Sequence, residues 1–279
     1  MDACPFGAIV EKTHLFDVIQ SVQNNKQTIA MVAPAIAGQF RESMEKITGS
    51  LIRLGFTDVY EVAMGADITS QTEAEEFYER AKAGKSMTTS CCPAYVNYID
   101  KHIPELKPKV SNTKTPMEYT AEYLRNTYPA ANLVFIGPCL GKKDEAIQSE
   151  NVDYVLNFEE YGSWLIAQNI EISECQEYPI HENISQQART YARTGGVSQA
   201  VAKEIPELEF KNVQFDGIDK RFTRQLKSAL KQEKPALIEV MACENGCLGG
   251  CYSIVDPKLG RRQLETFVKQ HATSEKTIH

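Results

Sequence analysis

The chain has 279 residues, of which 42% are hydrophobic and 24% are charged, and this composition is typical of a globular protein with a substantial core. Its formal net charge is -7 at pH 7 and its basic residues are scattered among acidic ones, which argues against nucleic acid and membranes as partners. The chain lacks a secretory signal pattern and an apolar stretch long enough to cross a bilayer, so we expect a cytoplasmic protein.

Helices and strands are expected to alternate through the first part of the chain. Apolar residues recur at helical spacing from Phe40 to Leu54, and Gly55 is a natural cap for the end of that helix. The run QTIAMVAP is typical of a buried strand that ends at Pro34. The expected elements are a helix at 13–24, a strand at 27–34, a helix at 40–54, a strand at 58–63, an acidic helix at 71–83 and a short strand that runs into position 91.

The second part repeats this alternation, interrupted by a stretch, 169–195, that is expected to contain loops. The pattern predicts an α/β fold of two lobes, each a mainly parallel twisted sheet flanked by helices, with a boundary near residue 130. The expected elements are strands at 133–136, 154–156, 213–215 and 236–241, and helices at 159–168, 196–204 and 221–232.

Three cysteine-bearing stretches each follow an expected strand. They are TSCCP at 89–93, GPCLGKKDEA at 137–146 and EVMACENGCLGGC at 239–251. Sites in open α/β sheets collect where loops leave the carboxyl ends of strands, so these loops can converge. A free cysteine is usually a small buried hydrophobe, but the neighbouring prolines and glycines suit backbone that wraps closely around a ligand. Thiolates from both lobes would suit an iron–sulfur cluster; zinc is the alternative, disfavoured by the lack of a CxxC pair or a nearby histidine.

The same stretches carry a family resemblance. TSCCP, PCLGKKDE and EVMAC followed by GC resemble the three signature motifs of the iron-only (FeFe) hydrogenase catalytic domain, and VAPAIAGQF, LGFTDVYEVAMGADIT and ARTGGVSQA resemble its intervening segments. The resemblance implies an oxidoreductase that reversibly reduces protons to molecular hydrogen. It also implies the H-cluster, a 4Fe-4S cubane linked to a diiron subcluster with CO, CN and azadithiolate ligands, which an apo form would lack.

Cysteine roles follow from that resemblance. It makes Cys92, Cys139, Cys243 and Cys247 the cubane ligands, with Cys247 bridging to the diiron unit. A helical turn between Cys243 and Cys247 would place both sulfurs on one face. Adjacent side chains point in different directions, and the resemblance places Cys91 beside the diiron unit as the thiol that transfers protons.

The acidic helix provides a candidate proton relay. Glu73, Glu76 and Arg80 share one helical face, which taken alone is more typical of a solvated, salt-bridged surface. The segment ADITSQTEAEEFYER resembles the family's relay stretch, and Ser111 matches the relay serine. The implied path runs from Cys91 through Glu73, Ser111 and Glu76 to Arg80.

Other residues are expected to surround the diiron unit. Lys142 resembles the lysine that hydrogen-bonds a cyanide, and Glu145 would orient Lys142 or its loop. Met241 matches a methionine near the bridging carbonyl, although it also suits a core position. Ala33 and Pro34 resemble the loop that closes over the diiron unit.

Several positions depart from the family pattern. Gly137 replaces a methionine, which is expected to leave that side of the pocket less filled, and Met117 replaces a glutamine. Asn245 replaces a glycine and Cys251 interrupts a run of glycines, so we expect their loop to follow a different course. We interpret Cys251 and Cys175 as lying outside the site chemistry.

The N-terminal stretch MDACPFGAI resembles the tail of a ferredoxin-type domain, without the cysteines that should precede Cys4. We therefore expect a ferredoxin-like remnant at 1–12, a first lobe at 13–130 and a second lobe at 131–279, with the metal site between the lobes. The implied partners are ferredoxin or a similar low-potential electron carrier, which would reach the cubane directly, and the maturation proteins that insert the diiron unit.

Two other functions are compatible with this fold. Some homologues resembling nuclear prelamin A recognition factor act in iron–sulfur assembly without hydrogen chemistry, and others sense hydrogen and signal through an attached domain. An assembly factor needs cubane ligands but no proton relay, so the presence of Cys91, Lys142, Glu73 and Glu76 favours the enzyme. No signalling domain is recognisable in the sequence.

Overall fold

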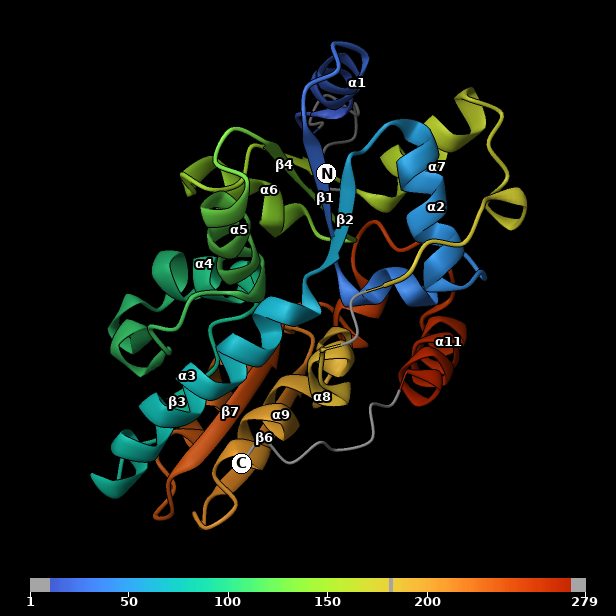
Figure 1. Ribbon diagram of the computed structural model, residues 1–279. Coiled ribbons are helices and arrows are strands. Elements are labelled where there is room, and N and C mark those ends of the chain that lie inside the picture. Colours follow the sequence, from blue (N-terminus) through green and yellow to red (C-terminus); the bar gives the residue numbers. More distant parts are fainter. Residues whose placement is uncertain (1–10, 181–182, 272–279) are drawn as a thin grey trace.

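The computed structural model describes residues 11–180 and 183–271. Seven strands in this part of the chain form two sheets with helices on both faces (Figure 1). The strand order is β2-β1-β4-β5 in the larger sheet and β3-β7-β6 in the smaller one, and every pair of neighbouring strands is parallel. The predicted α/β class, with parallel sheets flanked by helices, is confirmed.

The elements are short and alternate along the chain. The strands are β1 (Thr28–Val32), β2 (Asp58–Glu61), β3 (Met87–Thr88), β4 (Asn132–Ile136), β5 (Tyr154–Leu156), β6 (Lys211–Asp216) and β7 (Ala236–Met241). The α-helices are α1 (Leu15–Gln23), α2 (Met44–Leu54), α3 (Ala63–Lys82), α4 (Pro93–His102), α5 (Pro116–Thr127), α6 (Leu140–Gln148), α7 (Phe158–Ala167), α8 (Gln186–Arg189), α9 (Gly196–Glu204), α10 (Phe222–Ala229) and α11 (Pro257–Gln270). Short 3-10 helices are η1 (Pro34–Gly38), η2 (Pro104–Lys109), η3 (Ile172–Glu174), η4 (Thr190–Ala192) and η5 (Gly246–Gly249).

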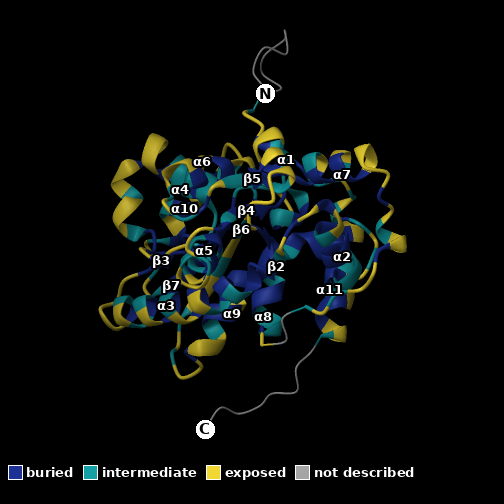
Figure 2. Cartoon of the chain, turned by 45° about the horizontal axis from the view of Figure 1, so that its top comes forward, coloured by how far each residue is buried: buried dark blue, intermediate teal, exposed yellow. Residues whose placement is uncertain are grey.

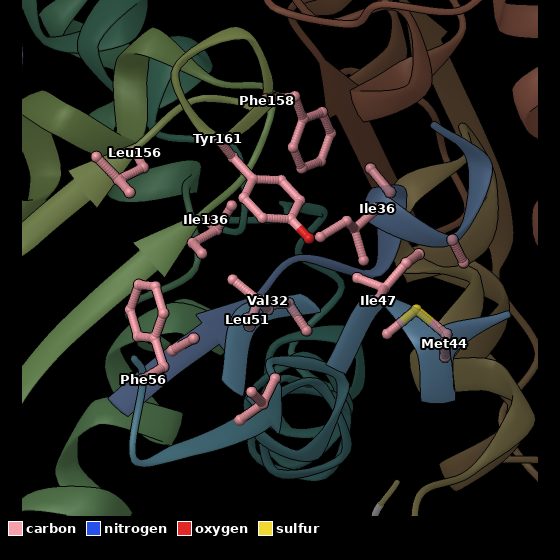
Figure 3. Close-up of a cluster of buried hydrophobic side chains, with 14 of the residues drawn as sticks. Val32, Ile36, Met44, Ile47, Leu51, Phe56, Ile136, Leu156, Phe158 and Tyr161 are labelled. Carbon is pink, nitrogen blue, oxygen red and sulfur yellow. The ribbon is translucent and has the colours of Figure 1, made fainter. Parts of the chain in front are cut away.

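The larger sheet is covered on both faces, so β1 is buried along its whole length. Ala30 and Val32 point into a core formed with α2 and α7, whereas Ile29 and Met31 point towards α5. A strand buried on both faces is an unbroken apolar run, which explains why this strand is recognisable in the sequence. Figure 3 shows the first of these cores, with labelled side chains that include Val32, Ile47, Leu51, Ile136, Leu156 and Tyr161.

The smaller sheet is arranged in the same way around its central strand, β7. Leu237 and Met241 belong to a core with α3 and α9, and Ile238 and Val240 belong to a core with α4 and α10. The central strand and the inner faces of the helices are therefore buried, while the edge strand β6 and the outer helix faces are largely exposed (Figure 2). This arrangement directs the carboxyl ends of the strands, and the loops that follow them, towards a protected region.

Two groups of helices differ from expectation. Helix α3 begins at Ala63, eight residues before the predicted start, because its first turns bury small residues that give no apolar stripe. A Cβ atom on Gly65 would lie 2.1 Å from the Pro116 carbonyl oxygen, so the small side chains let α3 approach α5 closely. Helices α4, α5, α6 and α11 were not predicted, although a proline in the first helical turn marks the start of three of them: Pro93, Pro116 and Pro257.

Both sheets combine strands from before and after residue 130, so the predicted boundary does not separate one sheet from the other. The division of the chain into lobes at 13–130 and 131–279 stays a prediction. Cys4 and most of the ferredoxin-like remnant predicted at 1–12 lie outside the described residues. In the described part of the chain, the structure has no helix with the length and apolar character of a bilayer-spanning segment.

Candidate metal centre and proton relay

Loops from both sheets meet at a cavity of about 90 Å³. The cavity lies beyond the carboxyl ends of β1, β3, β4 and β7, the position in which parallel sheets place their binding sites. Most of the side chains predicted for the diiron pocket line it: Ala33, Pro34, Cys91, Lys142 and Met241. Three of the predicted cubane ligands, Cys92, Cys139 and Cys247, also lie in its wall.

The four predicted ligand sulfurs form one electrostatic group, because each influences the ionisation of others. Burial, followed by the charge of Cys92, raises the pKa of Cys139 to about 12 and the pKa of Cys243 to about 11. Burial and the charges of Cys139, Cys92 and Cys243 raise the pKa of Cys247 well above its ordinary value. All four cysteines are free. Four partly buried thiols from three loops are a suitable donor set for a cluster that takes one thiolate at each iron.

Among the described residues, no three histidine, cysteine, aspartate or glutamate side chains are grouped as ligands of a single metal ion. The ligands of a four-iron cubane lie around the cluster rather than around one point, so the two kinds of site need different arrangements.

The third cysteine loop contains two consecutive residues in the left-handed conformation. Asn245 has φ of 67° and Gly246 has φ of 65°, so the chain between Cys243 and Cys247 does not form the predicted helical turn. The 3-10 helix η5 begins only at Gly246. Asparagine adopts this conformation more readily than other non-glycine residues, which explains how Asn245 occupies a position where the family pattern has glycine.

Close backbone packing holds this loop beside the second one. A Cβ atom on Gly250 would lie 2.6 Å from the carbonyl oxygen of Pro138, so a larger residue could not be accommodated without a shift. The exposed thiol of Cys251 lies 3.7 Å from the same oxygen, and the amide of Cys251 donates a hydrogen bond to the sulfur of Cys243. The backbone thus forms a narrow cradle around the sulfurs, as a bound cluster would require.

Glu73 is fully buried on α3. Its Oε1 accepts a hydrogen bond from the Ser90 amide at 3.0 Å, while its Oε2 has no partner among the described residues. Burial raises the pKa of Glu73 from 4.5 to about 7, although hydrogen bonds from Ser90 and Ser111 partly oppose the shift. A carboxyl group with a pKa near neutrality can both accept and release a proton at physiological pH.

Ser111, Glu76 and Arg80 continue from Glu73 towards the surface. Ser111 Oγ donates to Glu76 Oε2 at 2.6 Å, and Arg80 Nη2 donates to Glu76 Oε1 at 2.6 Å. Burial alone would raise the pKa of Glu76, but hydrogen bonds from Ser111 and the Asn112 amide, with the charge of Arg80, lower it overall. The structure therefore brings together the four side chains of the predicted path beyond Cys91.

The charge of Glu73 also reaches Cys91. Burial raises the pKa of the Cys91 thiol well above its ordinary value, and the nearby charge of Glu73 is the next largest cause. Cys91 therefore lines the cavity and lies close enough to Glu73 to feel its charge.

Lys142 extends into the cavity wall from α6 and is almost fully buried. Its Nζ donates to Glu145 Oε2 at 2.6 Å and to Thr115 Oγ1 at 3.0 Å. Burial by itself would lower the pKa of Lys142, but the charge and hydrogen bond of Glu145 raise it overall. Glu145 thus lies where it can orient Lys142. Thr115 is a third member of this hydrogen-bonded group, because its hydroxyl also donates to Glu145.

Comparison with known proteins identifies the family of this arrangement. Residues 26–251 match the family model described as iron only hydrogenase large subunit, C-terminal domain. The chain belongs to the iron-only hydrogenase family.

Individual relatives include hydrogenases and an assembly factor. The chain is 27% identical over 315 residues to NADP-reducing hydrogenase subunit HndD of Solidesulfovibrio fructosivorans, covering 88% of this chain and 53% of that protein. It thus spans about half the length of that relative. The fold is similar to that of an FeFe-hydrogenase from Chlamydomonas reinhardtii, with a TM-score of 0.72 at 19% identity and coverage of 91% and 88% of the two chains. The chain is also 28% identical over 156 residues to cytosolic Fe-S cluster assembly factor NAR1 of Candida dubliniensis, covering 50% and 27% of the two proteins.

One departure from the hydrogenase pattern has a structural explanation. The pocket beside Gly137 was expected to be less filled, but this expectation is wrong because the ring of Phe135 occupies the space. A Cβ atom on Gly137 would lie 2.6 Å from Phe135 Cε1 and 3.1 Å from the Cβ of Ala33. Phe135 and Met117 are both buried and both line the cavity, so this wall is apolar and closely packed.

Replacing Gly137 with alanine is therefore expected to lower the free energy of unfolding by about 1–3 kcal/mol, because the new methyl group must displace the Phe135 ring. Urea unfolding of the metal-free chain measures this change. Gly162→Ala is the matched control: its Cβ would meet only Phe40, at 3.8 Å, and an alanine within α7 should be neutral or stabilising. Equal stabilities of the two variants would contradict the proposed clash.

Glu73 gives a second prediction, on the pH dependence of stability. Because its pKa is higher in the folded chain, about 7, than its ordinary value of 4.5, folding favours the protonated form. The resulting stabilisation is complete below pH 4.5 and is lost as the pH rises to about 7. Glu73→Gln cannot ionise, so its stability relative to wild type should rise by up to roughly 3 kcal/mol across this range.

Urea unfolding at pH 5 and pH 8 tests this prediction. The control is Glu75→Gln, at an exposed position on the same helix, which should follow the wild-type pH dependence. A stability difference between Glu73→Gln and wild type that is the same at both pH values would show that burial does not raise this pKa.

Sequence reasoning missed several residues beside the site. Glu239, within the EVMAC motif, is fully buried and accepts hydrogen bonds from the amides of Gly195 and Ser198, both at 2.8 Å. These hydrogen bonds connect the start of α9 to β7. The residues just before α9, from Ala192 to Thr194, pack directly against Gly246. Thr115 was also missed; its position before Pro116 marks it as the N-cap of α5, but no local pattern indicates its contact with Lys142.

Proposed function

We propose that this chain houses an H-cluster at which protons are reversibly reduced to molecular hydrogen. The observation that carries this proposal is the placement of Glu73, a buried carboxyl group with a pKa near 7, between the cysteine-lined cavity and a hydrogen-bonded path to the surface. A protein that only bound or delivered an iron–sulfur cluster would have no use for such a path. Membership of the iron-only hydrogenase family supports the same activity.

In this proposal, the thiolates of Cys92, Cys139, Cys243 and Cys247 would hold the cubane. Lys142 would present its ammonium group to the anionic ligands of the diiron unit, beside Met241 and the Ala33–Pro34 loop. When bound, the cluster supplies the electrons and the site at which hydrogen forms. The apolar wall formed by Phe135 and Met117 would keep bulk water away from that site.

The protein's own contribution is the movement of protons. Cys91 would hold a proton at its sulfur on the cavity side and exchange it with the carboxyl group of Glu73. The hydroxyl of Ser111, which lies within reach of both carboxyl groups, would pass the proton between Glu73 and Glu76. Arg80 holds the Glu76 carboxylate at the outer end of the path and is partly exposed there.

The partners proposed for this activity are a low-potential electron carrier such as ferredoxin and the maturation proteins that insert the diiron unit, acting in the cytoplasm. The similarity to an iron–sulfur assembly factor supports a second candidate, a non-catalytic assembly role. The two candidates differ in what they need: only the enzyme requires Cys91 and the carboxyl groups behind it.

Hydrogen evolution tests the proposed function directly. The cubane would be reconstituted anaerobically, a synthetic diiron cofactor added, and hydrogen measured with a reduced low-potential dye. We expect hydrogen production that depends on both additions. An assembled cubane without hydrogen production, after the diiron cofactor has been taken up, would overturn the enzyme proposal in favour of assembly or sensing.

A further inference from the structure

A groove along α10 gathers positive charge on an otherwise acidic chain. The groove has a volume of about 610 Å³ and is lined by six residues, of which four are cationic: Lys220, Arg224, Lys227 and Lys231. The whole chain has a net charge of -7, so this grouping runs against the overall charge. Such a patch attracts acidic partners and raises their rate of association.

The geometry of α10 presents these charges to solvent. Arg224 and Lys227 are three residues apart on one side of α10, and Lys220 and Lys231 lie just beyond its two ends, so that all four line the same groove. The opposite side, with Phe222 and Leu226, is buried against the smaller sheet. Lys227 forms an ion pair with Glu105 at 2.7 Å, whereas the described residues include no ion-pair partner for the other three cations.

One end of the groove adjoins the candidate metal centre. The loop that leads from β6 into α10 donates hydrogen bonds from Gly217 and Ile218 to the carbonyl oxygens of Met241 and Ala242, at 2.9 and 3.3 Å. Ala242 is the residue before Cys243, and a Cβ atom on Gly217 would lie 2.9 Å from the side chain of Glu244, the residue after it. Lys220 lies in the same loop, two residues after Ile218. Glu244 and Asn245 are exposed, so the centre approaches the surface at this edge.

We propose that the α10 groove docks a small acidic electron carrier of the ferredoxin type, which exchanges electrons with the centre on the Cys243 side. This inference rests on the proposed function and assigns the surface that it uses. In each encounter, one electron leaves the reduced iron–sulfur cluster of the carrier and enters the centre, so the carrier is oxidised by one electron. Electron transfer weakens steeply with distance, and the position beside Cys243 favours a redox protein over other polyanions.

The test compares a protein donor with a small one. In the loaded enzyme, Lys220, Arg224 and Lys231 are replaced together by glutamine, leaving the paired Lys227 intact. At low ionic strength, hydrogen evolution driven by a reduced acidic ferredoxin should fall at least about tenfold in kcat/KM, and the difference should shrink as salt is added. Turnover with the small dye should be unchanged.

The matched control removes the same amount of positive charge at three other exposed positions, Lys26, Lys85 and Arg262. This variant should change neither the ferredoxin-driven rate nor the dye-driven rate.

A binding measurement separates failure of this inference from failure of the proposed function. The dissociation constant of oxidised ferredoxin for the cubane-loaded chain should rise at least about tenfold in the triple variant, whether or not the chain evolves hydrogen. Unchanged ferredoxin kinetics and binding would overturn the inference. An equal fall in the hydrogen-evolution rates with dye and with ferredoxin would also overturn it, because it would indicate damage at the metal centre. Loss of binding to duplex DNA or anionic vesicles, with ferredoxin binding intact, would overturn it in favour of another polyanion.

Discussion

Substitution of Cys91 with alanine is expected to lower hydrogen evolution by the loaded enzyme about 100- to 10,000-fold, the range typical for loss of a positioned acid–base group. The cavity wall would lose the only thiol that we assign to proton transfer, and Glu73 lies too deep behind it to replace it. Cys91→Ser keeps the side-chain size but replaces the thiol with a far less acidic hydroxyl, so it should recover little activity.

Two controls keep this prediction specific. Cubane absorbance and iron content should match wild type, because Cys91 is not among the proposed ligands. Cys251→Ala removes another thiol, one that lies beside Pro138 and Cys243, and we expect it to retain most of the activity. Full turnover in Cys91→Ala would exclude the proposed relay, and loss of the cubane in that variant would instead assign Cys91 to the ligands.

Combined replacement of Cys139 and Cys247 with alanine is expected to abolish stable cubane binding. The variant would keep only half of the proposed ligands, and iron needs thiolate donors at each corner of the cluster. Iron per chain after anaerobic reconstitution should fall from about four to near zero, with loss of the cluster absorbance.

The matched control is the double replacement of Cys175 and Cys251, which also removes two thiols. Cys175 is a buried cysteine of the larger sheet's core, and neither residue is a proposed ligand. This variant should load iron as wild type does. Equal iron loading of the two double variants would contradict the ligand assignment. Loss of iron from the control alone would show that Cys175 or Cys251 is needed for cluster binding instead.

Elements buried on both faces were the easiest to predict from the sequence. β1 and β7 are short runs of mainly apolar residues, since helices cover both faces of each strand; Glu239 is the buried exception in β7. The first turns of α3 were missed because close helix packing selects small residues such as Gly65, and these leave no apolar stripe. The filled wall beside Gly137 could not be predicted either, since it depends on the direction of the Phe135 ring rather than on residue identity.

The candidate site shows the same division. The four proposed ligand cysteines and Cys91 could be named from the sequence because they lie in short motifs that follow strands, where loops converge. The raised pKa of Glu73 could not be predicted in this way, because it depends on complete burial and on hydrogen bonds from Ser90 and Ser111, which lie in other segments of the chain. Thr115 and Glu239 act through contacts between segments distant in the chain, and such contacts leave no local pattern.

The strand order has a consequence for biosynthesis. The chain crosses repeatedly between the two sheets, and β7, the central strand of the smaller sheet, comes after the other six described strands in the sequence. β3 pairs with β7, so it must wait for about 150 further residues before its partner leaves the ribosome. The adjacent thiols that follow β3 stay uncovered through most of translation. Iron must therefore enter after synthesis of the strands is complete, and oxidants present during synthesis would reach these thiols first.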